Sequence, residues 1–397
     1  MLWTLRGEAA PTTETRFGHD RAAAARVERT FASRAHWRET PLFDAAELAA
    51  KLGLRHLWLK DESGRLGLNS FKSLGGAYAV TVKADEALRS NPVTTSGPRP
   101  TGTAERNPGA GNLTFACASD GNHGLSVAWG ASLLGLSALV YLHEGVSVER
   151  AQAIEALGAT VIRVKGNYDD SVIEASRESE KRGYRLIPDT SIGHETDAPW
   201  LVMEGYSVIG DEVVRQLSAS HARQPTHVFL QAGVGGFAAA VSAYLVREWS
   251  ASPPRIVIVE PSRAHCVSLS LRERRATAVP ADRSTVMSML ECYEASPAAV
   301  TVLLDTATHA IAISDESASH ASGLMEREGA PAVGLRSSES GAAGLAGLMN
   351  ALSSDAACEA LELGSESSVL VFNTERPVEC LFSPQLPATR QQFLNRP

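Results

Sequence analysis

The stretch that decides the fold is "LTFACASDGNHGLSVAWGASLLG", residues 113–135. It begins with an apolar run typical of a buried β-strand, which ends at a polar turn containing Asp120 and two glycines. From Asn122 onward, small and apolar residues follow one another as in a buried helix. The sequence therefore predicts a strand followed directly by a helix, with the polar turn at the carboxyl end of the strand.

The same alternation extends along the chain. Further strand candidates are residues 137–144, 160–166, 184–189, 226–233, 255–262, 307–314 and 368–375. Helical stretches separate most of them, and parallel neighbours need crossover connections of that length. We therefore expect an α/β protein with two doubly wound lobes, mostly parallel sheets and a ligand cleft between the lobes.

The domain boundaries follow from length and composition. A chain of 397 residues exceeds the usual size of a single core. Residues 90–112 are rich in Pro, Gly, Thr and Asn and predict a flexible loop. We expect a larger domain from residues 1–89 with 216–397, and a smaller α/β domain from residues 113–215.

Composition excludes several classes of function. A net charge of −8 gives no electrostatic footprint for nucleic acid. The five cysteines are scattered without a CxxC pair, so no metal site or disulfide framework is indicated. No apolar run approaches the roughly 20 residues that span a bilayer, and no signal peptide is evident. We expect a soluble, cytoplasmic protein without nucleic-acid or membrane partners.

A glycine turn joins a predicted strand to a helix in "QAGVGGFAAAVSAYL", residues 231–245. Gly233, Val234, Gly235 and Gly236 can bring backbone N–H groups around an anion, where the helix adds the positive end of its dipole. A phosphate would fit there, but the pattern matches neither a dinucleotide nor a nucleoside-triphosphate motif. The alternative is a plain packing turn.

Polar groups also gather in "SDGNHG", residues 119–124, at the carboxyl end of a predicted strand. Asp120 can exchange protons, Asn122 can bind a ligand oxygen, and Gly121 permits close approach. An Asx turn that caps the next helix is the alternative.

One lysine stands apart from the rest. Lys72 lies in "NSFKSLGGAYA", residues 69–79, among small and apolar residues, whereas the other five lysines, Lys60 among them, are expected to be solvated. Burial disfavours the ammonium form and so makes an amine nucleophilic toward an aldehyde. A lysine that extends along an amphipathic helix surface toward solvent is the alternative.

In combination, these stretches resemble pyridoxal-phosphate enzymes of the tryptophan-synthase β-like fold (fold type II), in which the cofactor lies in the cleft between the lobes. The resemblance implies that Lys72 bonds to the cofactor, that Asn122 contacts the ring hydroxyl and that the glycine turn, residues 233–236, holds the phosphate. The strand "VLVFNTE" is similar to the family strand whose hydroxyl faces the pyridine nitrogen, which places Thr374 there.

Within that family the chain more specifically resembles diaminopropionate ammonia-lyases, over about residues 35–375. The stretches that carry this resemblance are "SDGNHGLSVAWGASLLG", "IPDTS", "PWLVMEGYSVIGDE", "VFLQAGVGGFAAAV" and "IVIVEPSRAHC". The resemblance implies conversion of D- and L-2,3-diaminopropionate to pyruvate and ammonia by a homodimer.

The resemblance also implies roles for individual residues. Lys72 and Asp120 would act as bases on opposite faces of the substrate, and Asp189 would bind the distal ammonium or move protons at the leaving group. Substrate-pocket residues would be Ser119, Gly121, His123 and Tyr168. For three residues a structural role is the alternative: a strand-end turn for Asp189, a surface position for His123 and a packing contact for Tyr168.

Two segments depart from the family pattern. Residues 287–297, "MSMLECYEASP", replace a smaller glycine-containing stretch, and Arg376 stands where the family has glycine. The substrate is therefore open to another β-substituted alanine, as in serine or threonine dehydratases and β-replacement enzymes. A catalytically silent amino-acid-binding protein is the alternative of another class. Cys266 and Cys292 lie where relatives can carry cysteines, and we expect them reduced rather than bridged.

Overall fold

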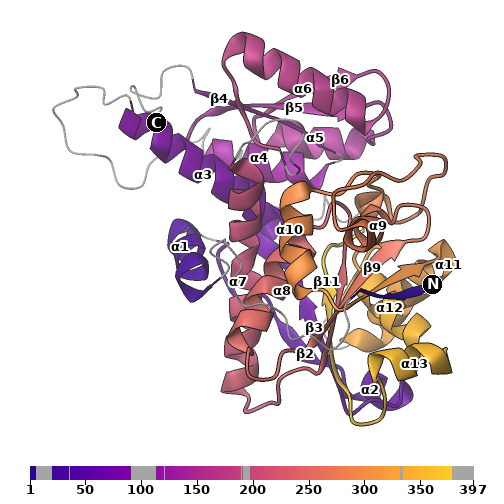
Figure 1. Ribbon diagram of the computed structural model, residues 1–397. Helices are drawn as coiled ribbons and strands as arrows, with labels where there is room; N and C mark the ends of the chain where they lie inside the picture. The colour runs from indigo at the N-terminus through magenta and orange to yellow at the C-terminus, as the bar shows by residue number, and fades with distance from the viewer. Residues whose placement is uncertain are drawn as a thin grey trace.

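Two β-sheets, each covered by helices, make up the fold of the computed structural model (Figure 1). The structure describes residues 1–5, 20–34, 36–90, 113–119, 121–188, 190, 197–330 and 334–377. Residues 91–112 of the predicted loop lie outside this part, as do Asp120 and Asp189.

The smaller sheet contains four parallel strands in the order β6-β5-β4-β7. Their bounds are β4 Thr114–Ala118, β5 Ser137–His143, β6 Thr160–Val164 and β7 Arg185–Leu186. Helices α4 (Asn122–Leu133), α5 (Val148–Ala156) and α6 (Tyr168–Arg182) connect them. Each α-helix follows a strand, which is the crossover that parallel neighbours require.

The larger sheet contains seven strands in the order β1-β10-β9-β8-β11-β3-β2. Their bounds are β1 Leu2–Thr4, β2 Leu42–Asp44, β3 His56–Asp61, β8 His227–Gln231, β9 Arg255–Pro261, β10 His309–Ile313 and β11 Ser368–Asn373. The five inner strands are parallel, whereas β1 and β2 pair antiparallel at the two edges. These pairings confirm the predicted α/β class with mostly parallel sheets.

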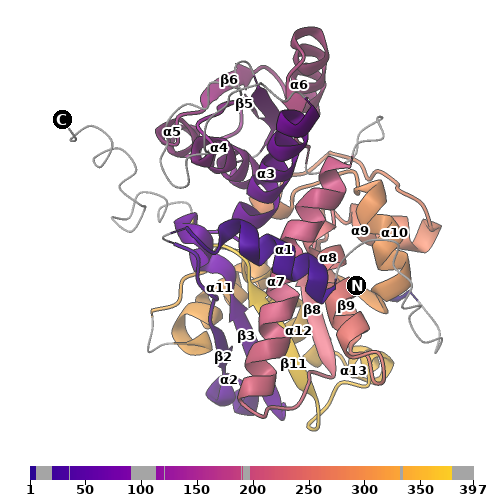
Figure 2. The same cartoon turned by 90° about the vertical axis from the view of Figure 1, so that its left-hand side faces the viewer.

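Helices cover both faces of the larger sheet and lie between the two sheets (Figures 1 and 2). The remaining helical elements are α1 Arg21–Phe31, α2 Ala46–Lys51, η1 Glu62–Gly67, α3 Lys72–Ser90, α7 Ala198–Ala219, α8 Gly236–Glu248, α9 Cys266–Glu273, η2 Ser288–Leu290, α10 Pro297–Thr306, α11 Asp315–Leu324, η3 Met325–Gly329, α12 Ala343–Leu352 and α13 Asp355–Leu361.

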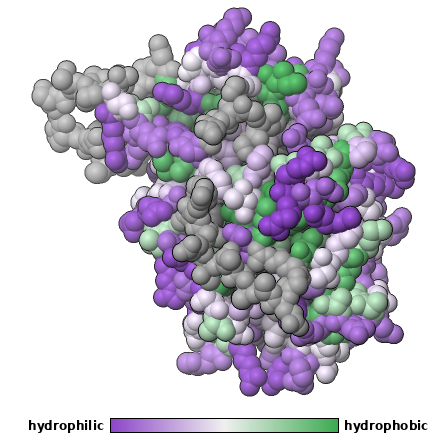
Figure 3. Space-filling model, in the orientation of Figure 1, coloured by the Kyte–Doolittle hydropathy of each residue, from purple (hydrophilic) through white to green (hydrophobic). Residues whose placement is uncertain are grey.

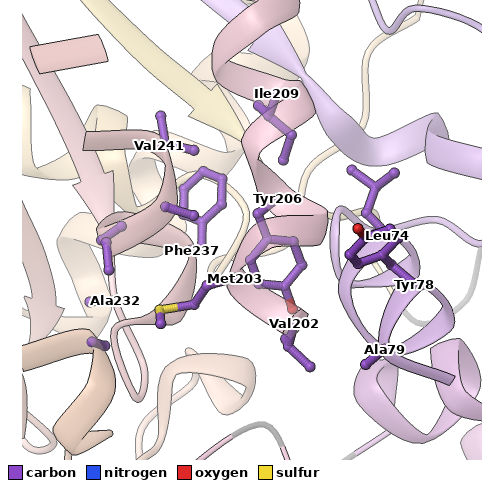
Figure 4. Close-up of a cluster of buried hydrophobic side chains, with 14 of the residues drawn as sticks. Leu74, Tyr78, Ala79, Val202, Met203, Tyr206, Ile209, Ala232, Phe237 and Val241 are labelled. Carbon is purple, nitrogen blue, oxygen red and sulfur yellow. The ribbon is translucent and has the colours of Figure 1, made fainter. Parts of the chain in front are cut away.

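Helix α7 packs between α3 and α8 through a continuous apolar core (Figure 4). Tyr206 and Met203 of α7 lie in this core with Phe237 of α8 and Leu74 of α3, and all four are buried. Helix α3 is also joined to α4, because Ser126 donates to the carbonyl of Ser73 at 3.0 Å. These contacts hold the first turn of α3, which begins at Lys72, between α7 and α4.

A buried ionic network fixes β3 and η1 to α7. Glu212 accepts from Lys60 Nζ at 2.7 Å and from both terminal nitrogens of Arg65 at 2.7 Å. Arg65 also binds Glu62 through two hydrogen bonds of 2.8 Å. Burial alone would raise the pKa of Glu212, but Arg65 and Lys60 lower it to about 2.

The prediction made for Lys60 from the sequence was wrong. We expected a solvated lysine, but its side chain is fully buried and paired with Glu212. Alternation on β3 turns Lys60 toward α7, 152 residues away in sequence, and no local pattern reveals this partner.

Hydrophilic residues cover much of the face drawn in Figure 3. Among the described residues, no helix has the length and apolarity needed to cross a membrane. The same residues contain no group of three or more His, Cys, Asp or Glu side chains suited to a metal ion.

Candidate functional site

Sequence-distant residues meet in a small pocket at the carboxyl ends of β8 and β11. Its lining includes Lys72, the turn 233–236 and Thr374, together with Phe71, Gln231 and Glu375. Strands β8 and β11 are parallel neighbours, so their carboxyl ends meet at one edge of the sheet. The structure thus brings the predicted lysine, glycine turn and hydroxyl together.

Lys72 is the first residue of α3 and is partly buried. Phe71, beside it, packs on Tyr206 and Phe237 with ring centroids 4.9 and 4.6 Å apart. The amide of Phe71 donates to the carbonyl of Thr374 at 3.1 Å. These contacts fix the backbone that carries Lys72 against the end of β11.

The turn 233–236 has the features of an anion cradle. Gly235 has φ of +99°, a conformation that favours glycine. A Cβ added at Gly233 would lie 3.0 Å from Cys292 Sγ and 3.3 Å from the Met289 carbonyl oxygen. In the described part of the chain, no side chain caps the N-terminus of α8. Its first amides are therefore suited to a phosphate group.

The ends of β8 and β11 each bring a polar side chain into the pocket, Gln231 from β8 and Thr374 from just after β11. Gln231 Nε2 donates to Thr374 Oγ1 at 3.1 Å, so the Thr374 hydroxyl proton is free to be donated elsewhere. Gln231 Oε1 is buried and accepts no hydrogen bond from the residues that the structure describes. Donors and acceptors of this kind suit a planar polar ring, and the glycine turn suits a phosphate, so the chemistry of the pocket matches that of pyridoxal phosphate.

The predicted turn 119–124 lies across from this pocket. Asn122, the first residue of α4, donates its side-chain amide to Glu375 Oε2. Ser119 Oγ accepts from the amides of Gly121 and Gly124 at 2.9 and 2.8 Å. His123 is buried, not on the surface, and its Nε2 lies 2.7 Å from the Ile187 carbonyl oxygen. Ser119 thus holds the turn together and His123 joins it to residue 187, and their roles toward substrate stay predictions.

A larger cavity of about 860 Å³ adjoins the pocket, and both are lined by Val234, Met289 and Cys292. Tyr168 lines the larger cavity and also packs against the core of the smaller sheet. The divergent segment 287–297 supplies much of the opposite wall, including Glu291 and Tyr293.

The cysteines near this wall are not bridged. Cys266 and Cys292 both carry free thiols, as expected. Burial, together with the nearby Glu260 carboxyl, raises the pKa of the Cys266 thiol.

Glu375 is the main residue that the sequence argument missed. Its carboxylate is buried, and burial raises its pKa, although Arg150, the Ser338 hydroxyl and Lys72 oppose that shift. Ser338 Oγ donates to Glu375 Oε1 at 2.7 Å. The only signal in the sequence was its place directly after Thr374 at the end of a buried strand.

Comparisons with known proteins agree with this geometry. The family model described as "Pyridoxal-phosphate dependent enzyme" matches residues 34–375. Diaminopropionate ammonia-lyase of Escherichia coli (strain K12) is 36% identical over 345 residues, which are 86% of this chain and 85% of that protein. The enzyme of the same name from Salmonella typhimurium (strain LT2) is 35% identical over 342 residues, which are 85% of this chain and 84% of that protein.

Solved structures give the same result. The crystal structure of the Escherichia coli enzyme with an aminoacrylate-PLP azomethine reaction intermediate has a TM-score of 0.81 at 32% identity, covering 96% of this chain and 94% of that chain.

Proposed function

Because the chain belongs to the pyridoxal-phosphate dependent enzymes, we propose that it eliminates ammonia from 2,3-diaminopropionate, in both D and L forms, to give pyruvate and ammonia. One observation carries this proposal: Lys72, the glycine turn 233–236 and Thr374 line a single pocket. The named relatives, similar over most of their length, support diaminopropionate as the substrate.

Pyridoxal phosphate bound in this pocket supplies an electron sink for the carbanion at the substrate α-carbon. In our proposal the amides of residues 233–236 hold the phosphate, and Asn122 donates to the ring hydroxyl. Lys72 would hold the cofactor covalently and would serve as a base at the substrate α-carbon.

Thr374 is proposed to face the ring nitrogen. Since its oxygen accepts from Gln231, its proton points to another acceptor, which suits an unprotonated nitrogen. The weaker electron sink that results favours elimination and limits transamination.

Acid and base roles of the two aspartates rest on the motif resemblance. Asp120 is proposed as the base on the face opposite Lys72, and Asp189 as the group that binds the distal ammonium. Ser119, Gly121, His123 and Tyr168 are proposed to surround the substrate. The larger cavity, which Tyr168 lines, gives the substrate access to the pocket.

The test combines absorbance with product analysis. The purified protein should show the visible absorption of bound pyridoxal phosphate, and Lys72→Ala should lose it, whereas Lys51→Ala, at an exposed lysine, should keep it. Wild type should release ammonia and pyruvate from both enantiomers of diaminopropionate faster than from serine. Faster release of ammonia from serine or threonine would indicate a dehydratase, and no turnover with normal cofactor absorbance would indicate a silent binding protein.

A second variant tests the stereochemical assignment. Asp120→Asn should reduce turnover of one enantiomer by at least tenfold more than that of the other, since each base serves one face. Equal losses for D and L substrates would show that Asp120 does not act on one face.

Three further proposals concern the protein as a whole. We infer that the protein forms a homodimer, which gel filtration with light scattering would test. We also infer that it is located in the cytoplasm, which cell fractionation would test. We also infer that residues 1–89 with 216–397, and residues 113–215, form separate domains. The presence of two sheets supports this division.

A further inference from the structure

Glu375 is a buried carboxylate in the cofactor pocket for which the mechanism above has no role. Its side chain is enclosed, and among the described residues the donors that bond to it directly, Asn122 and Ser338, are uncharged, while Arg150 and Lys72 act on it through their charge. Burying a carboxylate without a directly bonded cation costs free energy. Such a group in a cleft is a candidate for a functional role.

The backbone of Glu375 already has a structural task. Glu375 forms an antiparallel bridge with Ser70, and the amide of Arg376 donates to the carbonyl of Asn69 at 3.1 Å. This pairing joins the end of β11 to the residues just before Lys72. Since it uses main-chain atoms, it would persist with any side chain at position 375.

The side chain makes a separate connection, from β11 to the first residue of α4, across 253 residues of sequence. A carboxylate only accepts hydrogen bonds, so it must face the NH₂ group of Asn122 and not its carbonyl oxygen. The amide is thereby prevented from flipping. Its second N–H remains as a donor for another acceptor.

We propose that Glu375 is a positioning residue that fixes the Asn122 amide with an N–H directed at the cofactor ring hydroxyl. The inference rests on the proposed function, because that function places Asn122 beside the ring. Ser338 holds the carboxylate in turn: it donates to Glu375 and accepts from the Gly341 amide at 2.9 Å. A chain of hydrogen bonds thus runs from the backbone of residue 341 to the amide of Asn122.

A double-mutant cycle tests this role, with the dissociation constant of pyridoxal phosphate as the measurement. Apoprotein of wild type, Asn122→Ala, Glu375→Ala and the double variant is titrated with the cofactor and followed by absorbance. Each single variant should weaken binding by about tenfold, the effect of one charge-assisted hydrogen bond. The double variant should be no weaker than Asn122→Ala, because Glu375 acts through Asn122.

An additive loss of about a hundredfold in the double variant would overturn the proposal, and so would unchanged binding in Glu375→Ala. Ser242→Ala removes a buried hydroxyl pair with Thr306 and controls for loss of stability alone. If Glu375→Ala does not fold, Glu375→Gln replaces it in the cycle. The Gln side chain keeps an acceptor oxygen but can also turn its own NH₂ toward Asn122. Glu375→Gln should therefore weaken cofactor binding less than Glu375→Ala does. It should have no further effect on binding when Asn122 is already replaced by Ala.

Failure of this inference is distinct from failure of the proposed function. If wild type binds the cofactor through Lys72 and turns over diaminopropionate while the cycle is additive, only the role of Glu375 is wrong.

Discussion

Replacing Glu212 by Gln should destabilise the protein far more than loss of a surface charge. Glu212 is fully buried and accepts from Lys60 and from two nitrogens of Arg65, each at 2.7 Å. In this network the positive charges of Lys60 and Arg65 balance the carboxylates of Glu212 and Glu62. The variant therefore leaves one buried positive charge without a partner. Removing one member of a buried ion pair costs about 3–5 kcal/mol.

The assay is equilibrium unfolding in urea at pH 7.5, followed by tryptophan fluorescence. Glu366→Gln is the matched control, because Glu366 pairs with Arg55 at the surface and should contribute only about 0–1 kcal/mol. A second variant, Lys60→Met with Glu212→Gln, removes the excess charge and should recover at least about 1 kcal/mol of the loss. A loss in Glu212→Gln equal to that of the surface control would refute the reasoning, as would a double variant no more stable than the single one.

Two other predictions concern the glycine turn and the buried histidines. Gly235→Ala should cost roughly 1–3 kcal/mol of folding stability and weaken cofactor binding, because φ is +99° and the added Cβ would lie 3.2 Å from Ala299; Gly236→Ala, compared by thermal unfolding, should cost less. Burial lowers the pKa of His309 to about 4 and that of His227 below its usual range, whereas the unfolded value is about 6.5. Both rings are then neutral in the folded protein, so stability is full above pH 6.5 and should fall by about 1 kcal/mol between pH 7 and pH 5. If the unfolding free energy of His309→Gln fell with pH as steeply as that of wild type, the effect would come from other groups.

Most of the strand order along the chain was predictable because local spacing of apolar residues marks these elements. The run at 113–118 and the small residues after Asn122 became β4 and α4, and the later runs became β8, β9, β10 and β11. The inner strand β3 and the two edge strands β1 and β2 were not predicted. Strands β1 and β2 span three residues each, too few to show a period, and they form by pairing with strands distant in sequence.

The sequence by itself determined the α/β class and singled out the glycine turn and Lys72 as candidate site groups, since each of these depends on neighbouring residues. The tertiary structure decided which groups meet. Glu375 reaches Asn122 across 253 residues, Gln231 reaches Thr374 across 143, and Lys60 reaches Glu212 across 152. The physical reason is that a buried charge or amide takes its partner from whatever element packs against it, and that choice depends on sheet order and helix packing rather than on adjacent residues.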